Sequence, residues 1–207
     1  AADNPMSAEK VALGRWLFHD KRLSGNGRQA CAGCHVQALA FTDGRAQAIG
    51  STGELHPRGA QHLANVVYNA TLTWANPSLV TLERQMETPL FGEQPVEMGV
   101  NDGNKDAVLA RLRDDDAASA YPQRFAAAYP GQAQPINWGN VIKSIAAFQR
   151  SLISGNSRYD QWLAGKATLS DAQQRGMKLF FGEKAECFHC HGSFNFNDQI
   201  VHAASRV

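Results

Sequence analysis

The four cysteines of the chain form two closely spaced pairs, and a histidine directly follows each pair. The pairs stand in the strings CAGCH and CFHCH, which contain Cys31, Cys34, His35, Cys187, Cys190 and His191. C-x-x-C-H is the attachment motif of c-type haem, because the two thiols add across the porphyrin vinyl groups and the adjacent histidine supplies an axial nitrogen to the iron. The sequence therefore predicts two covalently bound haem c groups, with His35 and His191 as iron ligands.

Paired cysteines have other uses. Two C-x-x-C pairs also suit one zinc site with four thiolate ligands, and a single pair suits a disulfide or a thioredoxin-like redox centre. A histidine directly after both pairs is rare by chance, because the chain has only 7 histidines among 207 residues. No βαβ pattern surrounds either pair, which argues against the thioredoxin-like use. Paired zinc ligands remain the main alternative to haem.

The elements around the two pairs look duplicated. Each haem motif follows a Gly-x-x-Leu-Phe pattern, at 14–18 and at 176–180, which we expect to end a helix before a short loop delivers the cysteines. The second of these helices has a capping box, formed by Ser170 and Gln173. The chain therefore reads as two related haem-binding units.

The segments between the two motifs show helical periodicity. One amphipathic helix is marked by Val141, Ile145, Phe148 and Leu152 and should end near Gly155. Another is marked by Val108, Leu109 and Leu112 and ends in the acidic run 114–116. Segments 43–59, 89–104 and 130–137 are rich in Gly, Pro and Asn and read as loops. Strand-like alternation is sparse, so we predict an all-α fold with long loops.

The predicted organisation is two c-type cytochrome-like haem domains. Residues 1–163 form the N-terminal domain, and residues 164–207 open the C-terminal one. Only 16 residues follow His191, too few to wrap a haem, and a bare porphyrin would be a costly exposed apolar surface. We therefore expect the C-terminal domain to be truncated in this chain.

Composition limits the location and the partners. With 20 Lys and Arg against 19 Asp and Glu, the net charge is +1, so no basic field exists to attract nucleic acid. A membrane-spanning helix needs about 20 consecutive apolar residues, and the sequence contains no such run. Haem is attached covalently outside the bacterial cytoplasm, so we predict a periplasmic protein, and the start Ala1-Ala2-Asp3 looks like a mature end left after signal cleavage.

The order of motifs resembles a known family. The strings LGRWLFHDKRLS, CAGCH, FTDGR, HPRGAQHLANVVYNATLTW, LERQMETP, PVEMG and LFFGEKAECFHCH resemble the bacterial dihaem cytochrome c peroxidase and MauG family over essentially the whole chain. The text from 56 to 99 is most similar to the MbnH-like subgroup, which accompanies small copper-associated proteins. The resemblance implies a peroxide-reactive N-terminal haem, an electron-transfer C-terminal haem and a tryptophan between them.

Site residues follow from this resemblance. Trp74 matches the inter-haem tryptophan, and Gln85, Pro89 and Glu97 match the pocket on the peroxide side. A carboxylate there can move a proton between the peroxide oxygens, an amide can bind the oxidant, and a proline keeps the sixth iron position open. Each also has a purely structural interpretation. Trp74 could be a core residue, Gln85 a residue on a helix surface, Pro89 the end of a helix and Glu97 a solvated acid. Extra residues in this segment make Glu93 a competitor of Glu97.

Two positions depart from the family pattern. Ser51 stands where many of the peroxidases place a histidine ligand, so the first haem should be five-coordinate, as in the MauG branch, unless His56 or His62 moves in. Gly59 stands where the family commonly has a calcium-binding asparagine, so calcium is only a weak expectation.

The function implied is a periplasmic dihaem enzyme that uses hydrogen peroxide at a five-coordinate haem to oxidise a side chain of another protein. A copper-associated secreted protein is the candidate substrate. The first alternative is a conventional cytochrome c peroxidase, which takes electrons from a small redox protein, either a cytochrome c or a cupredoxin. The second alternative is a dihaem electron carrier without catalysis.

Overall fold

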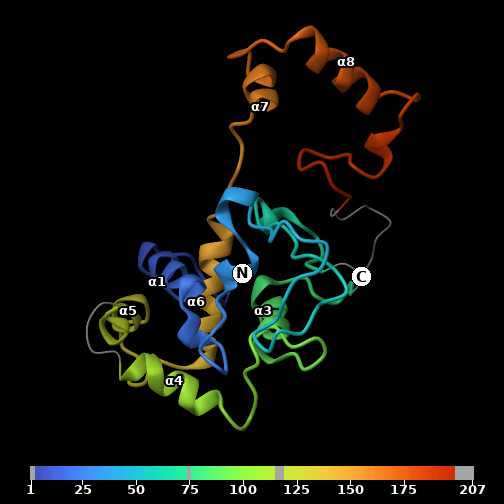
Figure 1. Cartoon of the computed structure of the whole chain (residues 1–207). Helices are drawn as coiled ribbons and strands as arrows, with labels where there is room; N and C mark the ends of the chain where they lie inside the picture. The colour runs from blue at the N-terminus through green and yellow to red at the C-terminus, as the bar shows by residue number, and fades with distance from the viewer. Residues whose placement is uncertain (1–2, 74–75, 115–118, 199–207) are drawn as a thin grey trace.

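The computed structural model describes residues 3–73, 76–114 and 119–198, which form helices joined by long irregular segments (Figure 1). The α-helices are α1 (Ala8–His19), α2 (Cys31–Cys34), α3 (Leu82–Phe91), α4 (Lys105–Arg113), α5 (Tyr121–Ala128), α6 (Trp138–Arg150), α7 (Arg158–Leu163) and α8 (Asp171–Phe180). Four 3-10 turns are η1 (Lys21–Leu23), η2 (Gln37–Leu39), η3 (Val66–Tyr68) and η4 (Cys187–His189). The described residues contain isolated bridges but no strand, which confirms the all-α prediction.

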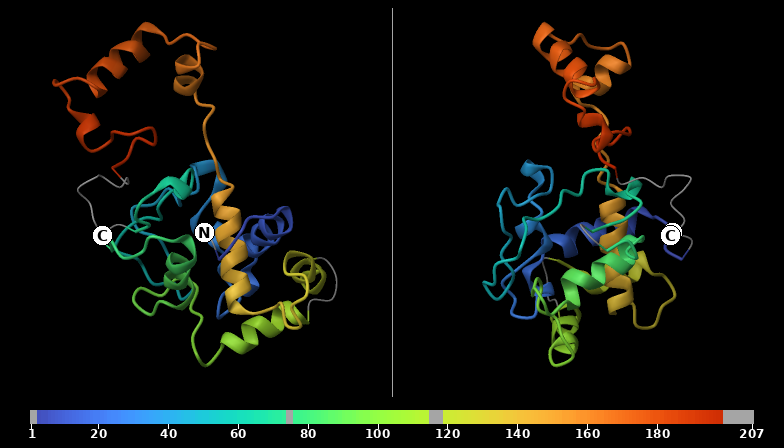
Figure 2. Two further views of the ribbon diagram at one scale, coloured as in Figure 1. Left: turned by 180° about the vertical axis from the view of Figure 1, so that it is seen from behind. Right: turned by 90° about the vertical axis from the view of Figure 1, so that its right-hand side faces the viewer.

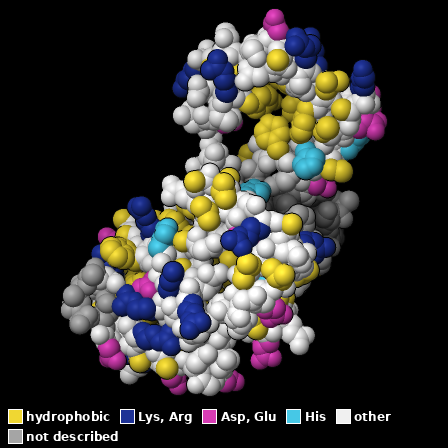
Figure 3. All heavy atoms as spheres, viewed as in Figure 1, with side chains coloured by type: hydrophobic (Ala, Val, Ile, Leu, Met, Phe, Trp, Pro, Cys, Tyr) yellow, Lys and Arg dark blue, Asp and Glu magenta, His cyan; other side chains and the backbone are white. Residues whose placement is uncertain are grey.

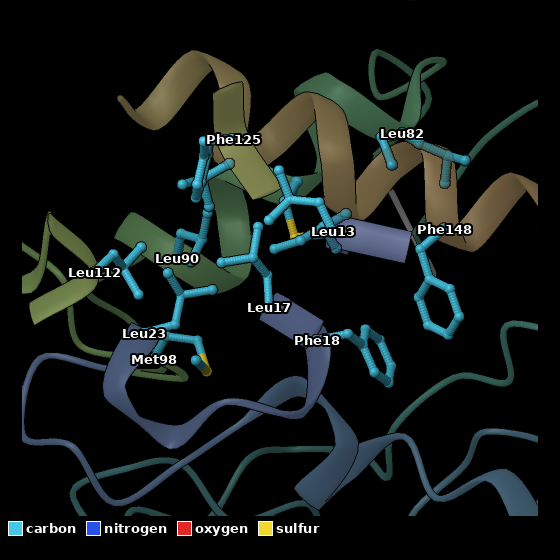
Figure 4. Close-up of a cluster of buried hydrophobic side chains, with 14 of the residues drawn as sticks. Leu13, Leu17, Phe18, Leu23, Leu82, Leu90, Met98, Leu112, Phe125 and Phe148 are labelled. Carbon is cyan, nitrogen blue, oxygen red and sulfur yellow. The ribbon is translucent and has the colours of Figure 1, made fainter. Parts of the chain in front are cut away.

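The core of the first part lies where α1 crosses α6, and α3, α4 and α5 close around it (Figure 4). Gly14 allows this crossing, because a Cβ atom there would lie 1.9 Å from the carbonyl oxygen of Ser144. Phe18 is fully buried beside it, with its ring centroid 5.2 Å from that of Phe148 and 6.3 Å from that of His35. The α1–α6 core therefore lies directly beside His35, the histidine of the first C-x-x-C-H motif.

The helix ends differ in part from those predicted. Helix α4 ends at Arg113, just before the acidic run, of which residues 115 and 116 lie outside the described residues. Helix α6 ends at Arg150 rather than near Gly155, because the amides of Ser151 and Leu152 close its last turn on Phe148 and Gln149. Leu152 thus lies beyond the helix.

Helix α3 also runs further than predicted, and Pro89 lies inside its last turn rather than at its end. A proline there removes only one helical hydrogen bond, to the carbonyl four residues earlier. The loop predicted from 89 therefore begins at Gly92.

Helices α7 and α8 and the turn η4 lie beyond the end of α6, joined to it by an extended segment (Figure 2). The predicted capping box of α8 is present, with Ser170 and Gln173 bonded to each other's backbone. The domain boundary between 163 and 164 stays a prediction. No described helix is both long and apolar enough to cross a membrane.

Candidate haem sites

The first C-x-x-C-H motif forms a single helical turn. Cys31 begins α2, Cys34 ends it, and the amide of His35 donates to the carbonyl of Cys31 at 2.9 Å. This turn directs both thiols and the imidazole to the wall of one cavity of about 610 Å³. Gln29 donates to the Cys34 thiol at 3.3 Å and to the carbonyl of Ile49 at 3.0 Å, which anchors the turn.

The His35 ring is oriented by the backbone. Its Nδ1 lies 2.8 Å from the carbonyl oxygen of Phe41, so Nδ1 carries the proton, because a carbonyl can only accept. Burial lowers the pKa of His35, against the opposing effect of hydrogen bonds to backbone groups of Phe41 and Gln61. The ring is therefore neutral at neutral pH, the form that ligates a metal through Nε2.

The zinc alternative has no support among the described residues. Among the described residues, the side chains that converge closely enough to hold a metal ion are the exposed Glu183, Glu186 and His189, and this group contains no cysteine. The two cysteine pairs therefore belong to separate sites.

The opposite wall of the cavity comes from α3 and the loop that follows it. Gln85 and Pro89 line it from the helix, and Glu97 lines it from the loop. The loop is held to the helix because the amide of Met98 donates to the carbonyl of Pro89 at 2.9 Å. The structure thus places Gln85, Pro89 and Glu97 in the lining of the same cavity as the first C-x-x-C-H motif, while Glu93 is exposed outside this lining. Their role on the peroxide side of a haem stays a prediction.

Glu97 is electrostatically unusual. Burial raises its pKa, and the charge of His56 opposes that shift only in part. Its own charge raises the pKa of both Cys31 and Cys34, so the carboxyl lies within electrostatic range of both thiols. A buried carboxyl with a raised pKa accepts a proton more readily than an ordinary glutamate, as a group that transfers protons must.

Several other residues of this region bear on the sixth iron position. His56 and His62 line the cavity, and His56 Nε2 lies 3.3 Å from the carbonyl of Val96. Ser51 lies outside the lining, and its amide donates to the carbonyl of Glu97 at 2.8 Å. The five-coordinate state of the first haem stays a prediction.

Gln149 is a cavity residue that the sequence analysis missed. Its side chain is 3% exposed, and its Oε1 has no hydrogen-bond partner in the described part of the chain. The available signal was its position four residues after Ile145, which puts a polar side chain on the apolar stripe of α6.

These residues fit a haem. The cavity has the size of a cofactor site, about 300 to 1,000 Å³ in general, and it combines apolar walls with few polar groups. The apolar walls include Leu63, Val66, Leu72, Leu79, Leu82 and Met86. Two thiols and a neutral imidazole converge on it, and the unpaired Gln149 Oε1 offers an acceptor for a group or a water inside it.

The second motif repeats the first in a more exposed setting. Cys187 begins η4, and Cys190 and His191 follow it. His191 Nδ1 lies 3.1 Å from the carbonyl oxygen of Phe196, and the equivalent distance from His35 Nδ1 to the carbonyl oxygen of Phe41 is 2.8 Å. Both phenylalanines have a positive φ, of 53° and 63°.

The duplication therefore continues past the haem motifs, which the sequence analysis missed. Its signal was a Phe-x-Asp string after each motif, at 41–43 and at 196–198. Hydrophobic side chains gather on the inner side of the arch formed by α7, α8 and η4 (Figure 3). The exposed large hydrophobic residues of this segment are Leu163, Leu179, Phe181, Phe194 and Phe196, of which Phe181 and Phe196 both contact Tyr159 of α7. An exposed apolar surface of this kind suits a wall for a second porphyrin.

Two further predictions concern Trp74 and Gly59. Trp74 lies outside the described residues, so its predicted position between the haems stays a prediction. At Gly59 a Cβ atom would lie 2.2 Å from the carbonyl oxygen of Arg45, so this backbone has no room for the asparagine of the family. Calcium binding is untested.

Comparison with known proteins places the chain in a family. Residues 8–168 match the family described as di-haem cytochrome c peroxidase. The chain is 39% identical over 203 residues to the cytochrome-c peroxidase IdrP1 of Denitromonas iodatirespirans, an alignment that covers 96% of this chain and 50% of the relative. It is 34% identical over 200 residues to the methylamine utilization protein MauG of Methylorubrum extorquens, covering 96% and 54%. The chain thus spans about half the length of the curated relatives it matches.

Solved structures agree with this match. A crystal structure of a MauG-like protein associated with microbial copper homeostasis is 56% identical, with a TM-score of 0.93 over 100% of this chain and 58% of that one. The diheme peroxidase BthA of Burkholderia thailandensis is 23% identical over 95% of this chain and 54% of that one, with a TM-score of 0.75, and supports the fold alone. Because the family match spans most of the chain and the cavity fits the haem of that family, the chain belongs to the dihaem cytochrome c peroxidase and MauG family.

Proposed function

We propose that this chain is part of a periplasmic dihaem enzyme that uses hydrogen peroxide to oxidise a side chain of another protein. In this proposal Cys31 and Cys34 would hold one haem c and Cys187 and Cys190 the other, with His35 and His191 as the iron ligands. The observation that carries the proposal is the shared cavity, in which Glu97, with its raised pKa, lines the same space as Cys31 and His35.

The residues of the chain have distinct tasks in this reaction. The bound haem iron supplies the site for peroxide and the redox change. Glu97 takes the proton from the inner peroxide oxygen and returns it to the outer one, which makes water the leaving group. Gln85 donates a hydrogen bond to the oxidant, and Pro89 offers no side chain that could occupy the sixth position.

The oxidising equivalents are then used at a distance. Trp74, by family resemblance, passes electrons between the two haem sites, because indole is among the most easily oxidised side chains. The partner loses electrons from one of its own side chains. The 56% identity to a MauG-like protein associated with copper homeostasis supports a secreted, copper-associated protein as that partner.

A conventional cytochrome c peroxidase is the second candidate. The 39% identity to a cytochrome-c peroxidase favours it, and its electrons would come from a small cytochrome c or a cupredoxin. A dihaem electron carrier, the third candidate, needs no open iron position and no proton shuttle at Glu97.

The deciding experiment follows the haem-loaded full-length protein through three measurements. The resting spectrum should show one high-spin haem, and peroxide should change both haem spectra. Mass spectrometry should then find an oxidised residue in the co-purified or genetically neighbouring secreted protein. Two low-spin six-coordinate haems at rest would favour the carrier. Rapid peroxide turnover with reduced cytochrome c and no modified partner would favour the conventional peroxidase.

A further inference from the structure

We propose that Asn69 is a positioning residue for the second haem site, where it holds the loop that orients His191. The inference rests on the proposed role of His191 as an axial ligand. The loop in question is residues 192–197, which follows the second haem motif directly.

Asn69 binds this loop on both sides of Phe196. Its Oδ1 accepts hydrogen bonds from Asn195 Nδ2 at 3.4 Å and from Asn197 Nδ2 at 3.2 Å. The carbonyl of Phe196, between these two donors, lies 3.1 Å from His191 Nδ1. The Asn69 side-chain oxygen, 126 residues before Asn195, therefore holds the loop whose Phe196 carbonyl orients His191.

Among the described residues, the second loop has fewer backbone hydrogen bonds of its own than the first. At the first site the loop is closed locally, because Val36 bridges Thr42 and the amide of Phe41 donates to the carbonyl of Val36 at 2.9 Å. Among the described residues the second loop has no matching bridge, and the amide of Phe196 reaches the carbonyl of Ser193 only at 3.4 Å. The other local hydrogen bonds of this loop depend on one side chain, Ser193, whose hydroxyl donates to the carbonyl of Asn197 at 2.9 Å and accepts from the amide of Asn195 at 3.3 Å. A non-glycine residue with positive φ is strained, so Phe196 persists only if its surroundings hold it.

Asn69 is itself fixed by the first haem unit. Its amide donates to the carbonyl of Val66 at 3.1 Å, and Val66 lines the first cavity. The preceding Tyr68 packs edge-to-face on Phe194 of the loop, with ring centroids 5.1 Å apart. The orientation of His191 is thus tied mechanically to the wall of the other haem site.

Loss of this contact has an electronic consequence. A histidine that donates its Nδ1–H to a carbonyl is a stronger electron donor to its metal and stabilises the ferric form over the ferrous one. Releasing the loop weakens that hydrogen bond and raises the reduction potential of the second haem. We expect a change of up to tenfold in the one-electron equilibrium, which is about 59 mV.

The test uses the haem-loaded full-length protein and the variants Asn69→Leu and Asn197→Leu. Spectroelectrochemistry should show a raised potential for the second haem in both, and electron paramagnetic resonance should show an altered low-spin signal. Asn197→Leu removes one of the two hydrogen bonds to Asn69 and Asn69→Leu removes both, so the double variant should shift no further than Asn69→Leu alone. Asn69→Asp keeps an acceptor oxygen and should not raise the potential.

Asn156→Leu is the matched control, since that side chain is exposed and has no hydrogen bond to the described residues. If Asn69→Leu fails to fold, Asn197→Leu still tests the contact from the loop side. Potentials and signals equal to those of Asn156→Leu would overturn the inference. If His191→Ala kept the low-spin signal of the second haem, the ligand assignment and the proposed function would fail instead.

Discussion

Glu97 is the residue on which the proposed proton transfer depends. Glu97→Gln keeps the size and polarity of the side chain but cannot accept and return a proton, so we expect the reaction with peroxide to slow by about 10² to 10⁴. Because burial raises the pKa of Glu97 and the carboxylate takes the first proton, the wild-type rate should fall as pH drops through that raised pKa. Stopped-flow absorbance from pH 4 to 9 at about 25 °C, with the haem still bound, measures both effects.

Glu93→Gln is the matched control for this prediction, since Glu93 is exposed outside the cavity. It should react at the wild-type rate with an unchanged pH profile. Equal rates in the two variants, whether slowed or unchanged, would contradict a specific role of the Glu97 carboxyl.

Glu83 on α3 shows how a single carboxylate joins three parts of the first unit. It accepts two hydrogen bonds from Arg150 of α6, each 2.6 Å, and one of 2.6 Å from Asn4. Burial alone would raise its pKa, but these partners lower the pKa to about 2. The stabilisation is therefore complete above the unfolded pKa of 4.5 and is lost as pH falls toward 2.

We expect Glu83→Gln to cost about 2 to 3 kcal/mol at pH 7, because Glu83 and Arg150 are only 15% and 12% exposed. The cost should shrink as pH falls from 4.5 to 2, where the wild-type carboxyl becomes protonated. Urea unfolding at a series of pH values measures it. Glu87→Gln, on the same helix but in an exposed pair with Arg84, should change stability by less than about 1 kcal/mol. A cost at Glu83 that is independent of pH would contradict the linkage.

At the scale of elements, the two glycines of the duplicated helices have different tasks. A Cβ atom on Gly14 would meet the backbone of α6, whereas one on Gly176 of α8 would meet nothing within 4 Å. Gly14→Ala should therefore destabilise the first unit by about 1 to 3 kcal/mol by pushing α1 from α6. Gly176→Ala should stabilise α8 by about 0.5 to 1 kcal/mol, since alanine is the better helix former. Thermal unfolding of both variants checks the pair, and a similar loss in both would contradict the crossing as its cause.

The helices and motifs also show which structural features could be predicted from the sequence and which could not. The C-x-x-C-H spacing and the apolar stripe of α6 are local signals, so the haem motifs and that helix could be read directly. The end of α6 could not, because Leu152 fits the stripe while its carbonyl is used by the amide of Asn65. Pro89 looked like a helix stop, yet one missing bond in a last turn is tolerated. Contacts between distant segments, such as Asn69 with Asn197, leave no periodic trace in a single sequence.

At the scale of the whole molecule, the segment from Asn65 to Asn69 carries contacts from the first haem unit to the chain beyond α6. Asn69 holds the loop after the second haem motif, and Asn65 holds the linker between the units. The backbone amide and the side-chain amide of Asn65 donate to the carbonyls of Leu152 and Ser154, both at 2.8 Å. Its Oδ1 accepts from the amide of Ser154 at 2.7 Å.

Asn65→Gly should loosen this linker without disturbing the backbone, because Asn65 has a φ of 59°, which glycine adopts at no cost. The variant loses two side-chain hydrogen bonds, each worth about 0.5 to 1.5 kcal/mol, so local opening should become roughly tenfold more frequent. Limited proteolysis followed by mass spectrometry should find faster cleavage within residues 151–157, since cleavage follows the population of the open form. Asn26→Gly, which removes side-chain bonds to Ser51 and Arg28 inside the first unit, should leave cleavage there unchanged. If both variants were cut at the wild-type rate, the linker would be held by contacts other than those of Asn65.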